Sequence, residues 1–222
     1  MRCKGVDLTL KAVLFDLDGT LIDSKKDIAA SANAVRAHFG LPMLPLEVVM
    51  GYIGWGIEHL TQKTLETDDP KRLAEGLEVF KNYYRDHCVD FTVIFPGVFE
   101  LLDFLKNRGI KLGVVSNKPH EFTLITLEKL KLMPYFSVAL GADATVNKKP
   151  HPEPLLTALQ RMGVKPSEAV MIGDSPVDAE AARATPMLVG LVSHGFVAKE
   201  YLNAADPDWL VDSLLDFMDI LA

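Results

Sequence analysis

Beyond residue 95 the chain alternates short apolar runs with amphipathic segments, and this alternation constrains the fold more than any other feature. The runs IKLGVVSN, FSVALGAD, EAVMIGD and PMLVGLV are nearly continuous in apolar residues, which is typical of strands buried on both faces. The amphipathic segments between them, such as GVFELLDFLKNRG, repeat apolar residues at helical spacing. The alternation predicts an α/β fold, with a Rossmann-like parallel sheet and helices on both faces. A similar run, AVLF at residues 12–15, is expected in the centre of that sheet.

Residues 24 to 90 show a different pattern, with no clear strand and two strongly amphipathic stretches. In SKKDIAASANAVRAHFG, Ser24 is a candidate helix N-cap and Gly40 a candidate stop. In PKRLAEGLEVFKNYYRDHC, Pro70 suits the first turn of a helix. We therefore expect a helical domain inserted after the first strand of the α/β core. The predicted boundaries are 1–22 and 96–222 for the core and 23–95 for the helical cap domain.

Composition and charge argue against several classes of protein. The formal net charge is −7, and nonspecific nucleic-acid binding needs basic patches that such a chain is not expected to have. No run of about 18 apolar residues is present, so neither a transmembrane helix nor a membrane partner is expected. The charged N-terminal segment reaches Asp16 too early for a signal peptide. Cys3 and Cys88 lie in no metal-like or CxxC spacing, so we expect ordinary thiols and a cytoplasmic protein.

Acidic and small polar residues stand where three of the predicted strands end. Asp16 and Asp18 follow the first strand, Ser116 and Asn117 follow LGVV, and Asp174 follows VMIG. Ligands of open α/β sheets bind beyond the carboxyl ends of the strands. Polar residues after a single strand are common in loops, but polar residues after three strands of one sheet indicate a shared site. Because carboxylates separated by one residue repel each other, this site is expected to supply positive charge or to use the negative charge.

Four motifs in this order, DLDGT, VVSN, KPHPEP and GDSPVD, resemble those of the haloacid dehalogenase superfamily. Each motif alone is weak, but four in order, each at the end of a predicted strand or helix, are specific. They span the predicted core domain. The resemblance, which includes an inserted helical cap, implies a phosphatase of this superfamily and therefore a phosphoric monoester hydrolase.

The resemblance implies divided roles for the two carboxylates of DLDGT. Asp16 is the nucleophile that attacks phosphorus and forms an aspartyl-phosphate. Asp18 is the general acid that protonates the departing alcohol and then takes a proton from the attacking water. A second carboxylate nearby is expected to raise one pKa, which favours a protonated Asp18. Gly19 allows the close backbone approach or the positive φ that this turn needs.

The resemblance also implies Mg²⁺ as the cofactor, because a hard divalent ion cancels the repulsion between phosphate and carboxylate. Its ligands are then the Asp16 carboxylate, the Asp18 backbone carbonyl and Asp174. Asp178 and Ser175 are expected to lie behind these ligands, and Asp178 is alternatively a ligand through water or a plain charge at a helix N-terminus. The residues expected to bind the phosphoryl group are Thr20, Ser116, Asn117 and Lys149, of which Lys149 also supplies catalytic positive charge.

The leaving group of the substrate is expected to contact the cap. The loop MGYIGWGIEHLTQ resembles the glycine-rich cap loop of phosphoglycolate phosphatases, although a loop that only packs the cap is the alternative. The implied substrate is a small phosphorylated metabolite, with 2-phosphoglycolate as the first choice. Lys148 is expected to be a solvated surface lysine, whereas the side chains of Asn117 and Lys118 are further candidates for substrate contact. The cap offers several partners for a substrate carboxylate and the sequence does not choose among them: Arg36, His59, Lys63, Arg85 and His87.

Four other functions are compared with this phosphatase. A β-phosphoglucomutase shares the core motifs and stays open as an alternative. A dehalogenase or phosphonatase would lack the acid–base group that Asp18 provides. A non-catalytic binding or regulatory protein on the same fold would have no reason to keep the full set of motif residues. The oligomeric state is left open between a monomer and a homodimer.

Overall fold

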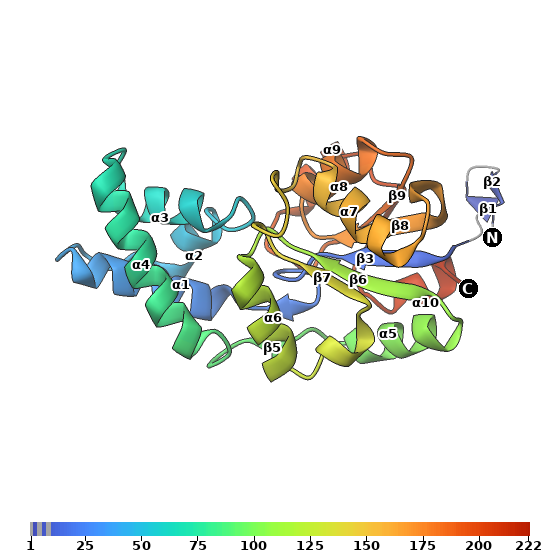
Figure 1. Ribbon diagram of the computed structural model, residues 1–222, viewed down its shortest axis with the longest axis horizontal. Coiled ribbons are helices and arrows are strands. Elements are labelled where there is room, and N and C mark those ends of the chain that lie inside the picture. Colours follow the sequence, from blue (N-terminus) through green and yellow to red (C-terminus); the bar gives the residue numbers. More distant parts are fainter. Residues whose placement is uncertain (1, 4–5, 8–9) are drawn as a thin grey trace.

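A six-stranded parallel sheet organises the larger part of the protein in this computed structural model, which describes residues 2–3, 6–7 and 10–222 (Figure 1). The strand order is β10-β9-β8-β3-β6-β7, and every neighbouring pair is parallel. β3 lies between β8 and β6, so the prediction of a central first strand is confirmed. The strands are β3 (Ala12–Phe15), β6 (Lys111–Val115), β7 (Val138–Leu140), β8 (Ala169–Gly173), β9 (Leu188–Val192) and β10 (Trp209–Val211).

Helices cover both faces of this sheet because successive side chains of a strand point to opposite faces. Val13 and Phe15 belong to one buried hydrophobic cluster with α5 and α10, whereas Ala12 and Leu14 belong to a second cluster with α7, α8 and α9. The helices are α5 (Val98–Asn107), α6 (His120–Lys129), α7 (Glu153–Met162), α8 (Pro176–Arg183), α9 (Lys199–Ala204) and α10 (Asp216–Ile220), with 3-10 turns η1 (Met133–Tyr135) and η2 (Pro166–Glu168).

Four helices inserted between β3 and β6 form a separate unit beside the sheet, shown at the left of Figure 1. They are α1 (Lys25–His38), α2 (Leu46–Met50), α3 (Ile57–Leu65) and α4 (Pro70–His87). Their inner faces share a third hydrophobic cluster, which also includes Phe122 of α6. The Tyr84 and Phe122 rings meet edge to face with centroids 5.2 Å apart, so this unit packs directly on a helix of the core.

Two short strands join the helical unit to the sheet. β4 (Ile22–Asp23) pairs antiparallel with β5 (Val93–Ile94), so the outgoing and returning chains lie side by side. The buried Asp27 carboxylate of α1 accepts hydrogen bonds from the Phe91 N–H, the Thr92 N–H and the Thr92 hydroxyl, at 2.6 to 3.1 Å. Asp27 therefore fixes the returning chain to the first cap helix.

Most of the expected elements are present, with one local correction. The four apolar runs beyond residue 95 form β6, β7, β8 and β9, and the two amphipathic stretches form α1 and α4. Pro70 opens α4, and Gly40 follows α1 with a φ of 65°. Ser24 occupies the N-cap position of α1 as predicted, but its side chain forms no cap hydrogen bond because its hydroxyl donates to Asp18 instead. The predicted boundaries at residues 22–23 and 95–96 stay a prediction.

Three further observations concern the N-terminal strands, the two cysteines and the length of the helices. β1 (Arg2–Cys3) and β2 (Val6–Asp7) form a short antiparallel pair. Cys88 is a buried free thiol, whereas the side chain of Cys3 lies outside the described part of the structure. No helix among the described residues is long and apolar enough to cross a membrane.

Candidate active site

The turn after β3 carries the first candidate residues to the carboxyl edge of the sheet. The Asp16 N–H donates to the Ile172 carbonyl of β8, and Asp16 Oδ1 accepts a 2.7 Å hydrogen bond from the Leu17 N–H. Gly19 has a φ of 86°, and a Cβ atom at this position would overlap the Asp174 carboxylate. Glycine therefore serves both the backbone conformation and the close approach to Asp174.

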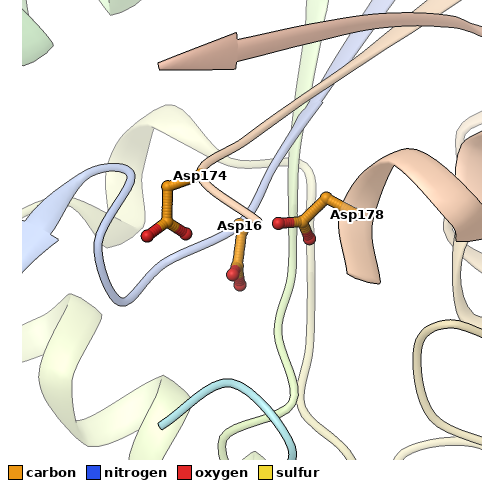
Figure 2. A group of neighbouring side chains, drawn as sticks. All are labelled: Asp16, Asp174 and Asp178. Carbon is orange, nitrogen blue, oxygen red and sulfur yellow. The ribbon is translucent and has the colours of Figure 1, made fainter. Parts of the chain in front are cut away.

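Three aspartates meet at this edge of the sheet. Asp16, Asp174 and Asp178 each offer a carboxylate oxygen, and these atoms lie within 4.8 Å of one another. Figure 2 shows Asp174 and Asp178 on either side of Asp16. Asp174 Oδ2 accepts from the Phe196 N–H at 2.8 Å, and the Thr20 hydroxyl lies 3.4 Å from Asp174 Oδ1. Thr20 thus contacts a carboxylate of the cluster, and its expected contact with the phosphoryl group stays a prediction.

Lys149 places a positive charge inside this acidic cluster. Its side chain is 1% exposed, and its Nζ lies 3.1 Å from Asp16 Oδ1. The same Nζ donates to Asp178 Oδ1 and to the Val115 carbonyl, both at 2.6 Å. The backbone N–H and the hydroxyl of Ser175 donate to the other Asp178 oxygen, at 3.2 and 2.9 Å. Asp178 therefore caps α8 and also holds Lys149 against Asp16.

The cluster carries more negative charge than Lys149 balances. Burial raises the pKa of the Asp16 carboxyl from 3.8 to about 6, against the opposing charge of Lys149 and with a contribution from Asp178. Burial and the charges of Asp16 and Asp178 raise the pKa of Asp174 well above its ordinary value. Burial lowers the pKa of Lys149, but the two neighbouring carboxylates raise it by more, so the lysine stays charged. The raised pKa values thus fall on Asp16 and Asp174, and burial is the largest cause of each.

Asp18 has a lysine partner of its own. Lys118 Nζ donates to both Asp18 carboxylate oxygens, at 2.7 and 2.8 Å, and the Lys118 side chain is 4% exposed. The Ser24 hydroxyl donates to Asp18 Oδ1 at 2.5 Å. Burial lowers the pKa of Lys118, but the charges and hydrogen bonds of Asp18 and Tyr84 together raise it by more, so the net value lies above the ordinary one. The two motif aspartates are therefore balanced by two different lysines.

The residues after β6 link the site to the helical unit. Ser116 is buried, and its hydroxyl oxygen accepts from the Lys118 N–H at 3.3 Å. The Asn117 amide donates to the Lys149 carbonyl at 2.8 Å and to the Gly54 carbonyl of the cap loop at 2.9 Å. Asn117 thus ties the cap loop to the segment that carries Lys149. Contact of Ser116 and Asn117 with a phosphoryl group stays a prediction.

A cleft opens where the helical unit faces the sheet edge. Its core side includes Asp16, Asp18, Ser116, Lys118 and Asp174. The side chains on its cap side are apolar except for one hydroxyl, and the lining residues there are Ile28, Ile53, Gly54, Gly56, Ile57, Leu60, Phe80 and Tyr84. The carboxylates predicted from the sequence therefore face a largely apolar wall.

None of the five basic cap residues expected as carboxylate partners lines this cleft in the part of the chain that the structure describes. Arg36 Nη1 donates to the Thr64 carbonyl, Arg85 pairs with Glu121, and His87 pairs with Asp90. These side chains have partners that stabilise the cap or its contact with α6.

Lys148 differs from the expected solvated lysine. Its Nζ donates to the Trp55 carbonyl of the cap loop at 2.7 Å and lies 3.7 Å from Glu58. Lys148 is therefore a contact between core and cap. A second unanticipated feature is the segment Gly195–Phe196, since a Cβ at Gly195 would overlap the Asp174 carboxylate. No motif in the sequence signals either contact.

The donor set fits a hard divalent cation. Carboxylate oxygens are the ligands that such ions prefer. Burial, and after it the neighbouring carboxylates, raise the pKa values of Asp16 and Asp174, and a bound cation would relieve both effects. Backbone at Gly19 and Gly195 surrounds the Asp174 carboxylate without side chains between. Asp178 is already engaged by Lys149 and Ser175. Asp16 and Asp174 are thus the side chains best placed to hold an ion.

Comparison with known proteins gives consistent relatives. Residues 13–192 match the family model of haloacid dehalogenase-like hydrolases. The phosphoglycolate phosphatase of Nitrosospira multiformis is 37% identical over 214 residues, which cover 94% of both chains. That of Neisseria meningitidis is 38% identical over 220 residues, covering 96% of this chain and 94% of the relative. The crystal structure of a predicted phosphoglycolate phosphatase from Haemophilus somnus has a TM-score of 0.92 at 28% identity, covering 98% of this chain and 100% of that chain.

These similarities confirm the predicted resemblance, the α/β fold and the enzyme class, a phosphoric monoester hydrolase. The matched segment contains the four motifs of the site and the inserted helices. Since the family model spans more than half of the chain and these relatives align along nearly all of it, the protein belongs to the haloacid dehalogenase-like hydrolases.

Proposed function

We propose that the protein is a Mg²⁺-dependent phosphatase that hydrolyses a small phosphomonoester, with 2-phosphoglycolate as the first choice, through an aspartyl-phosphate. The observation that carries this proposal is the Asp16 carboxylate in the cleft, 3.1 Å from the buried Lys149 ammonium. A carboxylate nucleophile needs nearby positive charge to approach an anionic phosphoryl group. Lys149 supplies that charge from outside the lining of the cleft, to which Asp16 belongs.

The first half-reaction follows from the positions of two carboxylates. Asp16 attacks phosphorus, the bond to the ester oxygen breaks, and Asp18 gives a proton to that oxygen. To carry this proton, one Asp18 oxygen exchanges its hydrogen bond from Lys118 for one that it donates to the ester oxygen. Ser116 donates its hydroxyl to a phosphoryl oxygen, and Lys149 balances the charge of the phosphoryl group. Bound Mg²⁺, held by the Asp16 and Asp174 carboxylates and the Asp18 backbone carbonyl, would supply charge neutralisation and orientation.

The second half-reaction uses the same groups in reverse. Asp18, now ionised, takes a proton from a water molecule that attacks the phosphorus of the aspartyl-phosphate. The bond between phosphorus and the Asp16 oxygen breaks, and phosphate leaves. Lys149 stays hydrogen-bonded to Asp178, so its ammonium keeps its position through both steps. Asp178 is a positioning residue in this scheme because it acts through Lys149.

Two considerations support a short leaving group. The relatives that align over almost the whole chain carry the name phosphoglycolate phosphatase. The cap side of the cleft presents mainly aliphatic and aromatic side chains among the described residues. Such a wall gives few hydrogen-bond partners to the several hydroxyl groups of a hexose, and unpaired polar groups are costly to bury. The β-phosphoglucomutase alternative is therefore disfavoured.

The test measures phosphate release from 2-phosphoglycolate and maps the intermediate. Asp16→Asn is expected to lower kcat by at least about a thousandfold, as removal of a nucleophile does. Asp23→Asn is the matched control, because Asp23 of β4 forms an ion pair with Lys25 and lies outside the lining of the cleft. Borohydride added during turnover should reduce the aspartyl-phosphate and convert Asp16 to homoserine, which mass spectrometry detects. Full activity of Asp16→Asn, or undiminished activity in excess EDTA, would contradict the mechanism.

A further inference from the structure

Lys118 is the one cation among the described side chains that line the cleft. It follows β6 directly after Ser116 and Asn117, and its side chain reaches across to Asp18. Lys149 lies deeper, beneath Asp16, and is not part of the cleft wall. An anionic group on the leaving alcohol would therefore meet Lys118 as its nearest positive charge.

The donors of Lys118 are only partly used. An ammonium group has three N–H donors, and the two Asp18 oxygens accept two of them. The third donor lies near the Tyr84 hydroxyl, and it is the donor that a ligand between these two groups would take. The ester oxygen must lie within hydrogen-bond distance of Asp18 for protonation, and a glycolate carboxylate begins only two bonds from that oxygen. The geometry thus brings such a carboxylate next to the Lys118 ammonium.

Tyr84 of α4 adds a second donor on the opposite wall. Its ring lies 4.8 Å from Lys118 Nζ, and its buried hydroxyl oxygen interacts with that ammonium, which can only donate to it. The hydroxyl proton itself has no acceptor among the described residues. Burial raises the pKa of this hydroxyl, so it keeps its proton and can donate. Buried polar groups are rarely left unpaired in folded proteins, and an unpaired donor in a ligand cleft indicates a partner that arrives with the ligand.

The apolar walls strengthen this recognition. Ile57, Leu60, Phe80 and Phe122 exclude water from the same part of the cleft. Charges interact more strongly where water is excluded, and a carboxylate buried there without a cation would be strongly unfavourable. Removal of the cation should therefore penalise an acid far more than a neutral substrate of equal size.

We propose that Lys118, together with the Tyr84 hydroxyl, binds a carboxylate on the leaving group and selects phosphate esters of short hydroxy acids. This proposal rests on the proposed phosphatase function and adds the residues that choose the substrate. Lys118 is a specificity-determining residue here, since it contacts the part of the substrate that distinguishes it from other phosphomonoesters.

The test compares two substrates that differ at one group. 2-Phosphoglycolate carries a carboxylate where 2-hydroxyethyl phosphate carries a neutral hydroxymethyl group. The wild-type enzyme is expected to favour the acid in kcat/KM by about a hundredfold, the effect typical of a charged partner in a desolvated site. Lys118→Met should reduce this ratio to near one, Lys118→Arg should keep most of it, and Tyr84→Phe should lower it several-fold. Lys199→Met is the matched control and should leave the ratio unchanged, because Lys199 pairs with Asp212 on the surface and lies outside the lining of the cleft.

Binding measurements keep the test decisive if Lys118→Met turns over neither substrate. Calorimetric titration with 3-phosphonopropionate and 3-hydroxypropylphosphonate, which cannot be hydrolysed, reports the same difference between acid and alcohol. Loss of the preference for the acid in folded Lys118→Met supports the inference. An unchanged preference for the acid in that variant, or no preference in the wild type, overturns the inference about Lys118. The proposed phosphatase function still stands in that case if the wild type hydrolyses 2-phosphoglycolate. Failure of the wild type to hydrolyse either ester overturns the proposed function instead.

Discussion

The acidic cluster makes a quantitative prediction about Asp16→Asn in the absence of metal. The pKa of Asp16 rises from 3.8 to about 6 on folding. At roughly 1.4 kcal/mol for each pKa unit, ionisation of Asp16 disfavours the fold by about 3 kcal/mol. A neutral asparagine of nearly the same shape avoids this cost. In EDTA at about pH 8, the free energy of unfolding of Asp16→Asn should exceed that of the wild type by up to about 3 kcal/mol.

The sign of the pH dependence follows from the raised pKa. The folded state holds the Asp16 proton more tightly than the unfolded chain does. The resulting stability is fully present below about pH 4 and is lost as the pH rises through about 6. The advantage of Asp16→Asn should therefore be large at about pH 8 and absent at about pH 4. Asp174 adds to the difference in the same direction, because the charge of Asp16 is one cause of its raised pKa and the variant removes that charge.

Urea denaturation followed by circular dichroism measures these differences at both pH values, with EDTA or with saturating Mg²⁺. Mg²⁺ should stabilise the wild type more than Asp16→Asn at about pH 8, because the variant lacks one charged ligand. Asp23→Asn serves as control and should track the wild type throughout. If Asp16→Asn is no more stable than the wild type in EDTA at high pH, the cluster is not the source of electrostatic strain that the raised pKa implies.

Three shorter predictions concern the surroundings of the site. Gly19→Ala should destabilise the protein by about 1–3 kcal/mol and slow phosphate release strongly, because Gly19 has a φ of 86° and its backbone lies against Asp174. Thermal unfolding measures the loss of stability, and phosphate release from the substrate measures the loss of activity. Asp27→Ala should lower the free energy of unfolding by about 2–4 kcal/mol in urea titrations, since it leaves buried donors near Thr92 unpaired. Lys148→Met removes a hydrogen bond to the cap loop and should raise the radius of gyration in X-ray scattering; equal scattering would show that this contact does not hold the cap.

The sequence predicted the fold because its signals are local. Apolar runs with helices between them define a parallel sheet, and the motif aspartates follow strands whose carboxyl ends must share an edge. The strand β10 was missed because its three half-buried residues lie at the edge of the sheet, where no long apolar run is needed. The short helix α2 was missed for a similar reason, since five residues carry little periodicity.

The sequence does not predict which charged side chains pair when they are far apart along the chain. Lys118 and Asp18 are 100 residues apart, and neither motif states which lysine reaches which carboxylate. The five basic cap residues looked equally suitable because their distance from the cleft depends on helix packing. Lys118 is only a minor candidate from the sequence. Its position directly after the VVSN motif is nevertheless a usable signal, because residues that follow the carboxyl end of a strand lie near the shared site.

The charges of the site explain how its crowded carboxylates are tolerated. The four carboxylates are Asp16, Asp18, Asp174 and Asp178, and the two ammonium groups are Lys118 and Lys149. Fully ionised, the set keeps a net charge of −2, which one divalent cation would cancel. The raised pKa values fall on Asp16 and Asp174, the two side chains proposed as metal ligands, whereas Asp18 and Asp178 each hold a lysine at 2.6 to 2.8 Å. The excess negative charge is therefore concentrated where Mg²⁺ is proposed to bind, and the lysines leave that position open.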